Sequence, residues 1–226
     1  VFLGCDALAC VHVPSKVEYI SSSAFLQVPN IIYRGKLKGA PWGALACNGY
    51  VEGNMVYADA TKRVLGGCRG EVSSVVIPDP VQVIGPHAFR FSKGLRSVVI
   101  PDGVVSIGDN AFDGCQELTA ITLPDSVVEI GAKAFDGCAA LQSVALGAAV
   151  RTIGDFAFAS CSQLASITLP ATVTSIGAYA FTRTGLTSIA LPDGVKVVRQ
   201  YCFDECRKLA SVSFGNAVTE IADRAF

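Results

Sequence analysis

Nine cysteines are the first residues of this 226-residue chain that could bind a metal or form disulfides. No CxxC pair occurs, so a zinc ribbon is not expected. Five cysteines share one position of a repeat that Ser92 and Thr184 fill in other units: Cys5, Cys115, Cys138, Cys161 and Cys206. Interchange with Ser and Thr predicts a small buried site whose side chain bonds to a neighbouring loop, and free cysteine is among the most buried residue types. We therefore expect reduced core thiols, while pairing of Cys47 with Cys68 remains an alternative.

The two histidines, His12 and His87, fall in different units of the repeat, and neither has a nucleophile at motif spacing. The chain contains no HExxH, GxSxG or Walker sequence. The sequence therefore predicts no catalytic residue, no metal ligand and no cofactor, and the protein is not expected to be an enzyme.

Aspartates follow a proline in three successive units, as Asp79, Asp102 and Asp125. Stacked, these carboxylates would form a column that could hold Ca²⁺ through oxygen ligands. Aspartate after proline is also an ordinary turn former, and that is the favoured interpretation.

The composition narrows the class of protein. Lys and Arg number 18 against 19 Asp and Glu, and this balance argues against a nucleic-acid partner. With 51% hydrophobic and 16% charged residues, the chain is too apolar to remain disordered. Its mean hydropathy is +0.46, yet charges or prolines interrupt every apolar stretch before the roughly 18 residues that a membrane span needs.

A repeat of about 23 residues organises the chain, and the phenylalanines define it: Phe2, Phe25, Phe89, Phe112, Phe135, Phe158, Phe181, Phe203 and Phe226. The unit that runs from Leu118 to Cys138 reads LTAITLPDSVVEIGAKAFDGC. Its Ile121 and Leu123 alternate like a strand with one buried face, Pro124 ends that strand, and Ala134-Phe135 is expected on a short helical turn that closes the coil. Stacked units can bury what one unit cannot, so the phenylalanine column is expected to be a main stabiliser.

The pattern LxxIxLPxxVxxIGxxAFxxC resembles the BspA-type, or treponemal-type, leucine-rich repeat over Phe2–Phe25 and Val72–Phe226. The resemblance implies an α/β fold: a right-handed solenoid with a parallel sheet of short strands on its concave side and short helical turns opposite. It also implies a bacterial or protist surface protein that mediates adhesion and protein binding rather than catalysis.

An insert separates Phe25 from Phe89. Its arms Tyr50–Glu52 and Met55–Tyr57 flank Gly53-Asn54, which is typical of a tight hairpin. Trp42 is expected to fill the core of this hairpin, and an exposed anchor for a partner is the alternative. We expect one leucine-rich repeat domain over residues 1–226, with the hairpin insert at about 30–70, and we expect that it is a segment of a longer array because no polar capping unit closes either end.

Two columns of side chains are candidates for a partner-binding surface. Phe156, Tyr179 and Tyr201 occupy the position two before the repeated phenylalanine in three consecutive units and are the predicted site, as an aromatic ridge. Mutual stacking between coils is the structural alternative. The outward strand position holds no Trp, Tyr or Arg and predicts weak binding: His12, Val76, Val99, Thr122, Ala145, Thr168, Ala190 and Ser213.

The sequence thus predicts a cell-surface or secreted interaction and adhesion module. Its partner would be a protein, such as host extracellular matrix or another surface protein. The alternative function is a purely structural spacer within a larger surface protein.

Overall fold

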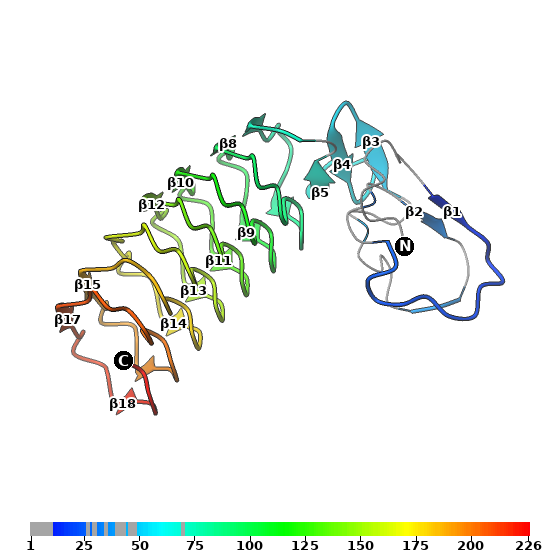
Figure 1. Cartoon of the computed structure of the whole chain (residues 1–226). Coiled ribbons are helices and arrows are strands. Elements are labelled where there is room, and N and C mark those ends of the chain that lie inside the picture. The colour runs from blue at the N-terminus through cyan, green and yellow to red at the C-terminus, as the bar shows by residue number, and fades with distance from the viewer. Residues whose placement is uncertain are drawn as a thin grey trace.

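The computed structural model describes residues 11–25, 28, 31–33, 36–38, 44, 49–68 and 71–226. From β6 onward the coils stack side by side in a single row (Figure 1). The expectations for Trp42 and for the Cys47–Cys68 pair fall outside the described residues, as do Cys5 and Cys10.

Most coils contribute a three-residue strand to the first side of the row, whereas residues 166–168 occupy this place in their coil without forming a strand. These strands are β6 (Ser74–Val76), β8 (Ser97–Val99), β10 (Ala120–Thr122), β12 (Ser143–Ala145), β15 (Ser188–Ala190) and β17 (Ser211–Ser213). They pair in parallel as β6–β8, β10–β12 and β15–β17, each residue opposite the one 23 positions further on. In most of them only the middle residue is buried, which confirms the predicted alternation.

Two-residue strands form the second side. They are β7 (Val83–Ile84), β9 (Ser106–Ile107), β11 (Glu129–Ile130), β13 (Thr152–Ile153), β14 (Ser175–Ile176), β16 (Val197–Val198) and β18 (Glu220–Ile221). Five of them run in parallel through one sheet in the order β14-β13-β11-β9-β7, while β16 pairs with β18. The resemblance implied one row of strands, whereas the coil has two.

The third side carries the Ala-Phe pairs and corrects the expectation of helical turns. The described residues contain no helix, so the α/β class is not supported and the solenoid is built from strands and turns. We call the repeated phenylalanines from Phe89 onward the spine phenylalanines. The physical reason is that the residue two positions before each of them has a left-handed backbone, such as Asn110 at φ 55° or Tyr179 at φ 58°. A right-handed helix cannot pass through such a residue. The backbone bonds to the next coil instead, as from the Phe112 amide to the Ala134 carbonyl at 2.7 Å.

The predicted phenylalanine column is the centre of the core. Phe89, Phe112, Phe135, Phe158, Phe181 and Phe203 are at most 1% exposed. Neighbouring rings stack with centroids 5.1 to 5.6 Å apart and planes within 6° of parallel. The residue before each is small and buried, which leaves room for the rings to lie over one another.

The insert extends the second side of the row. As predicted, β3 (Tyr50–Glu52) and β4 (Met55–Tyr57) form an antiparallel hairpin around Gly53-Asn54. The next strand, β5 (Val64–Cys68), pairs antiparallel with β4 and parallel with β7, so the insert joins the sheet of the coils. Nearer the N-terminus, β1 (Val11–Val13) and β2 (Ile31–Tyr33) form a separate parallel pair.

Candidate functional site

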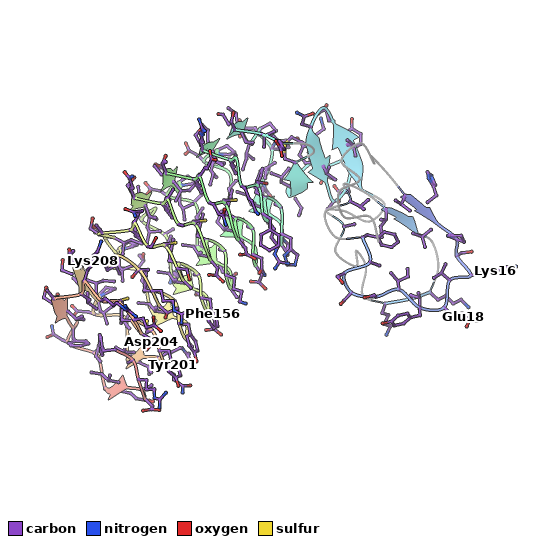
Figure 2. The ribbon with its side chains drawn as sticks, viewed as in Figure 1. Lys16, Glu18, Phe156, Tyr201, Asp204 and Lys208 are labelled. Atoms are coloured by element: carbon purple, nitrogen blue, oxygen red, sulfur yellow. The ribbon has the colours of Figure 1, made fainter. Side chains whose placement is uncertain are left out.

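The predicted ridge of Phe156, Tyr179 and Tyr201 is a continuous stack of rings. The centroids of Phe156 and Tyr179 lie 4.4 Å apart, and those of Tyr179 and Tyr201 lie 4.6 Å apart, with planes within 13° of parallel. All three side chains are half-buried. Figure 2 shows Phe156 and Tyr201 along one edge of the row of coils, with Asp204 beside Tyr201. The three rings therefore stack on one another between coils, as the structural alternative expected. A partner could contact only the ring edges and the hydroxyls.

Cations close both ends of this stack. The Lys133 ammonium lies 5.2 Å from the centre of the Phe156 ring, and the Arg224 guanidinium lies 5.8 Å from that of Tyr201. Attraction between a cation and a ring face contributes about 0.5–1 kcal/mol at an exposed site. Lys133 and Arg224 stand two residues before Phe135 and Phe226, the same repeat position as the ridge residues. Their role was not anticipated from the sequence, because it becomes visible only when neighbouring coils are stacked.

The outward strand face of the stacked coils carries small side chains. Val76 and Val99 lie opposite each other in β6 and β8 and are 65% and 57% exposed. The Ser97 hydroxyl donates to the Ser74 hydroxyl at 3.0 Å, linking the neighbouring column. These residues point outward as predicted, and the face offers a partner no large anchor.

The cysteine column is buried and hydrogen-bonded between coils. The thiols of Cys115, Cys138 and Cys161 are fully buried, and each donates to the carbonyl of a phenylalanine in the preceding coil at 3.1 to 3.2 Å. The described cysteines of this column form no disulfide. Burial raises the pKa of the Cys115 thiol to about 12 and the pKa of the Cys138 thiol well above its ordinary value. The prediction of a buried thiol ladder that bonds to neighbouring backbone is confirmed for these described positions, and their reduced state stays a prediction.

We predict that a thiol reagent leaves Cys115, Cys138 and Cys161 unmodified in the native protein at pH 8, since the reactive thiolate is scarce and covered. Denaturant should expose all three to rapid labelling. Mass spectrometry of labelled peptides measures this directly. Rapid native labelling, or bridged peptides among the three, would contradict the ladder.

Aspartates on the turns act as backbone acceptors. Asp125 Oδ1 accepts the Ala148 amide of the next coil at 2.8 Å, which supports the interpretation of this residue as a turn former. Asp109 and Asp155 accept amides of the next coil in the same way, from Ala132 and Ala178. Within the described residues, no three His, Cys, Asp or Glu side chains come together as metal ligands would.

A second charged column, missed by sequence analysis, follows the spine phenylalanines. The Arg90 Nε donates to Asp113 Oδ2 at 2.8 Å, although Asp113 is only 9% exposed. Asp136 occupies the same position one coil further on and is half-buried. Burial, and then repulsion from Asp113, raise the pKa of Asp136 above its ordinary value. The signal was a charged residue after three consecutive spine phenylalanines.

Asp136→Asn is expected to stabilise the protein at pH 7, because the folded state holds this carboxylate at a raised pKa. Folding favours the protonated form of Asp136. The stability that this form contributes is therefore fully present below the unfolded pKa and is lost as pH rises through the folded pKa. The gain from Asp136→Asn should therefore shrink as pH falls toward 3. Urea unfolding at several pH values tests this, and a gain independent of pH would refute it.

The histidines lie apart. His12 is exposed on β1, whereas His87 is half-buried on the third side of the coil at φ 61°. Burial, followed by the nearby Arg90, lowers the pKa of His87.

A family of repeat proteins matches most of the chain. The BspA type Leucine rich repeat region matches in six copies, over residues 1–34, 66–184 and 128–226. The chain belongs to the BspA-type leucine-rich repeat family. Proteins of this repeat family are typically non-enzymatic and generally serve as protein-interaction modules.

Solved structures of leucine-rich repeat proteins resemble this member. A Treponema pallidum leucine rich repeat protein is 32% identical with a TM-score of 0.67, over 72% of this chain and 79% of that one. A Bacteroides ovatus protein is 30% identical with a TM-score of 0.63, over 76% of this chain and 55% of that one. A Eubacterium ventriosum protein, 22% identical over 87% of this chain and 58% of that one, shares the fold with a TM-score of 0.71. A comparison with curated proteins finds no match.

The described part of the chain contains no helical segment that could span a bilayer.

Proposed function

We propose that this chain is a cell-surface or secreted interaction module that binds a protein partner through the aromatic ridge of Phe156, Tyr179 and Tyr201. Membership of a family of protein-interaction repeats supports a binding role. The ridge is the observation that carries the choice of site, because three aromatic side chains from consecutive coils are only half-buried. Tyrosine is enriched at the residues that dominate binding energy, and the strand face has no comparable anchor.

The contact that such a ridge can make follows from its stacking. Ring faces are covered by their neighbours, so the partner meets ring edges, which carry positive partial charge and attract carbonyl oxygens. The hydroxyls of Tyr179 and Tyr201 add donors, and Lys133 and Arg224 extend the row at both ends. This surface suits a polar, carbonyl-rich protein surface such as a matrix protein.

The experiment is capture of protein from host extracellular matrix by the wild type and by four variants. Tyr179→Ala and Tyr201→Ala should each lose about five-fold or more in affinity for a captured partner, a loss that most interface residues do not reach when truncated to alanine. Thr122→Ala and Thr168→Ala, at exposed outward positions on the first side of the coils, should bind normally. Tyr179→Phe keeps the stack and removes the hydroxyl, so it separates edge contact from hydrogen bonding.

Stability must be measured for each variant, because loss of stacking also destabilises the coils. Normal binding by the ridge variants together with loss in the strand-face variants would place the site on the strand face.

The alternative function is a structural spacer. The observation that favours it is the closure of the aromatic stack by a cation at each end, which ties five consecutive coils together. A spacer would retain nothing from the matrix, and the wild type alone distinguishes the two functions.

A further inference from the structure

A carboxylate on the third side of the coils lacks the ion pair that its neighbour has. The residues directly after the spine phenylalanines are Arg90, Asp113, Asp136, Ala159, Thr182 and Asp204. Arg90 forms an ion pair with Asp113 of the next coil. The residue that follows Asp136 in this column is Ala159, which is buried and cannot form an ion pair. Within the described part of the chain Asp136 enters no ion pair. Lys133, which attracts it, has its ammonium over the Phe156 ring instead.

The space beside Asp136 is open. At the equivalent place one coil earlier, the Phe91 ring lies across Gly114, so that a Cβ on Gly114 would sit 2.5 Å from a ring carbon. A Cβ on Gly137 would meet nothing closer than the backbone of Gly114 at 3.8 Å. In the part of the chain that the structure describes, no side chain beyond those of its two chain neighbours lies within 4 Å of this position at Gly137, the residue next to Asp136. A side chain from another molecule can approach the carboxylate there.

The net charge of the surrounding coils indicates which charge an approaching side chain of another molecule should carry. Residues 90–160 hold eight Asp and Glu against five Lys and Arg. Arg90 and Arg96 already pair with Asp113 and Glu117, and Lys133 lies over the Phe156 ring. Long-range attraction from this segment favours a cationic partner, and it supplies no cation to Asp136 from within.

We propose that Asp136 accepts a Lys or Arg side chain from a basic segment of a protein partner, which lies over Gly137 as Arg90 lies beside Asp113. Arginine fits best, because its planar fork can bond both carboxylate oxygens. This inference rests on the proposed function, since it names the chemistry of a protein partner bound on the same side of the coils as the ridge. It predicts that partner segments are basic at the point where they pass Asp136.

The test is the binding of a fluorescein-labelled peptide of alternating Arg and Gly, followed by fluorescence anisotropy at low and physiological salt. Asp136→Asn should weaken binding about ten-fold or more, as expected for loss of a charged hydrogen bond in a half-buried site. Asp102→Asn removes the same charge from an exposed position of the acidic segment and should weaken binding less than about two-fold. Gly137→Asn, which tolerates the local φ of 69° and covers the open position, should weaken binding as Asp136→Asn does.

Three outcomes overturn the inference: no binding by the wild type, normal binding by Asp136→Asn, or equal losses in Asp136→Asn and Asp102→Asn. Calcium binding that depends on Asp136, without peptide binding, would assign the site to a metal and also overturn it. The two proposals fail separately. Matrix capture through the ridge without peptide binding refutes only this inference, whereas peptide binding without matrix capture refutes the adhesion module and leaves the site.

Discussion

Phe135→Ala is expected to lower the free energy of unfolding by about 3–5 kcal/mol, the range for a fully buried aromatic truncated to alanine. Phe135 is 0% exposed and its ring is stacked on both faces, with centroids 5.2 Å from Phe112 and 5.3 Å from Phe158. The backbone between coils is hydrogen-bonded on this side, so the coils cannot close over the cavity. Urea unfolding at pH 7 measures the change.

Phe226→Ala is the matched control, because Phe226 belongs to the same column but is 51% exposed and stacks only on Phe203 within it. Its loss should cost less than about 1.5 kcal/mol, since much of the ring is already in water. A cost below about 1 kcal/mol for Phe135→Ala, or equal costs for both variants, would mean that the column is not the spine of the coil.

The spine, the first row of strands and the hairpin could be predicted because apolar residues recur there with a fixed period. Phe135 and Ile121 are buried, as are most residues of their columns, and the period of about 23 residues is visible when the sequence is compared with itself. The tight turn at Gly53-Asn54 has an equally local signal. These features depend on residue type alone.

The third side could not be predicted in this way. The left-handed position is filled by residues as different as His87, Lys133 and Phe156, so no residue type marks it. Ala134-Phe135 looks compatible with a helical turn, and local preference alone cannot exclude one. Hydrogen bonds to the next coil decide the conformation, and they exist only once the coils are stacked.

The same limit explains what was missed at the candidate site. The column of Phe156, Tyr179 and Tyr201 is visible in the sequence, but closure of the stack by Lys133 and Arg224 depends on side-chain direction. Whether Asp136 forms an ion pair likewise depends on which side chains the nearby cations contact. Arg90 turns toward Asp113, and Lys133 turns toward Phe156.

Close approach of the coils at glycine is the second strong constraint on the fold. A Cβ at Gly154 would lie 2.6 Å from the Ala132 nitrogen and 2.6 Å from the Gly131 carbonyl carbon. Both atoms belong to the backbone of the preceding coil, which cannot turn aside as a flexible side chain could. The Gly154 amide also donates to the Ile130 carbonyl at 2.8 Å, which fixes the separation of the two coils.

Gly154→Ala is therefore expected to cost about 2–3 kcal/mol, at the upper end of what overpacking costs, because relief requires the coils to move apart. Gly94→Ala is the same substitution at an exposed glycine with nothing within 4 Å of its Cβ position, and it should be neutral or stabilising by less than about 1 kcal/mol. Urea unfolding of both variants gives the comparison. Equal stability of Gly154→Ala and Gly94→Ala would contradict this prediction. It would mean that neighbouring coils can move apart by several tenths of an ångström at little cost, so that the rings of the spine are not held tightly at their observed spacing.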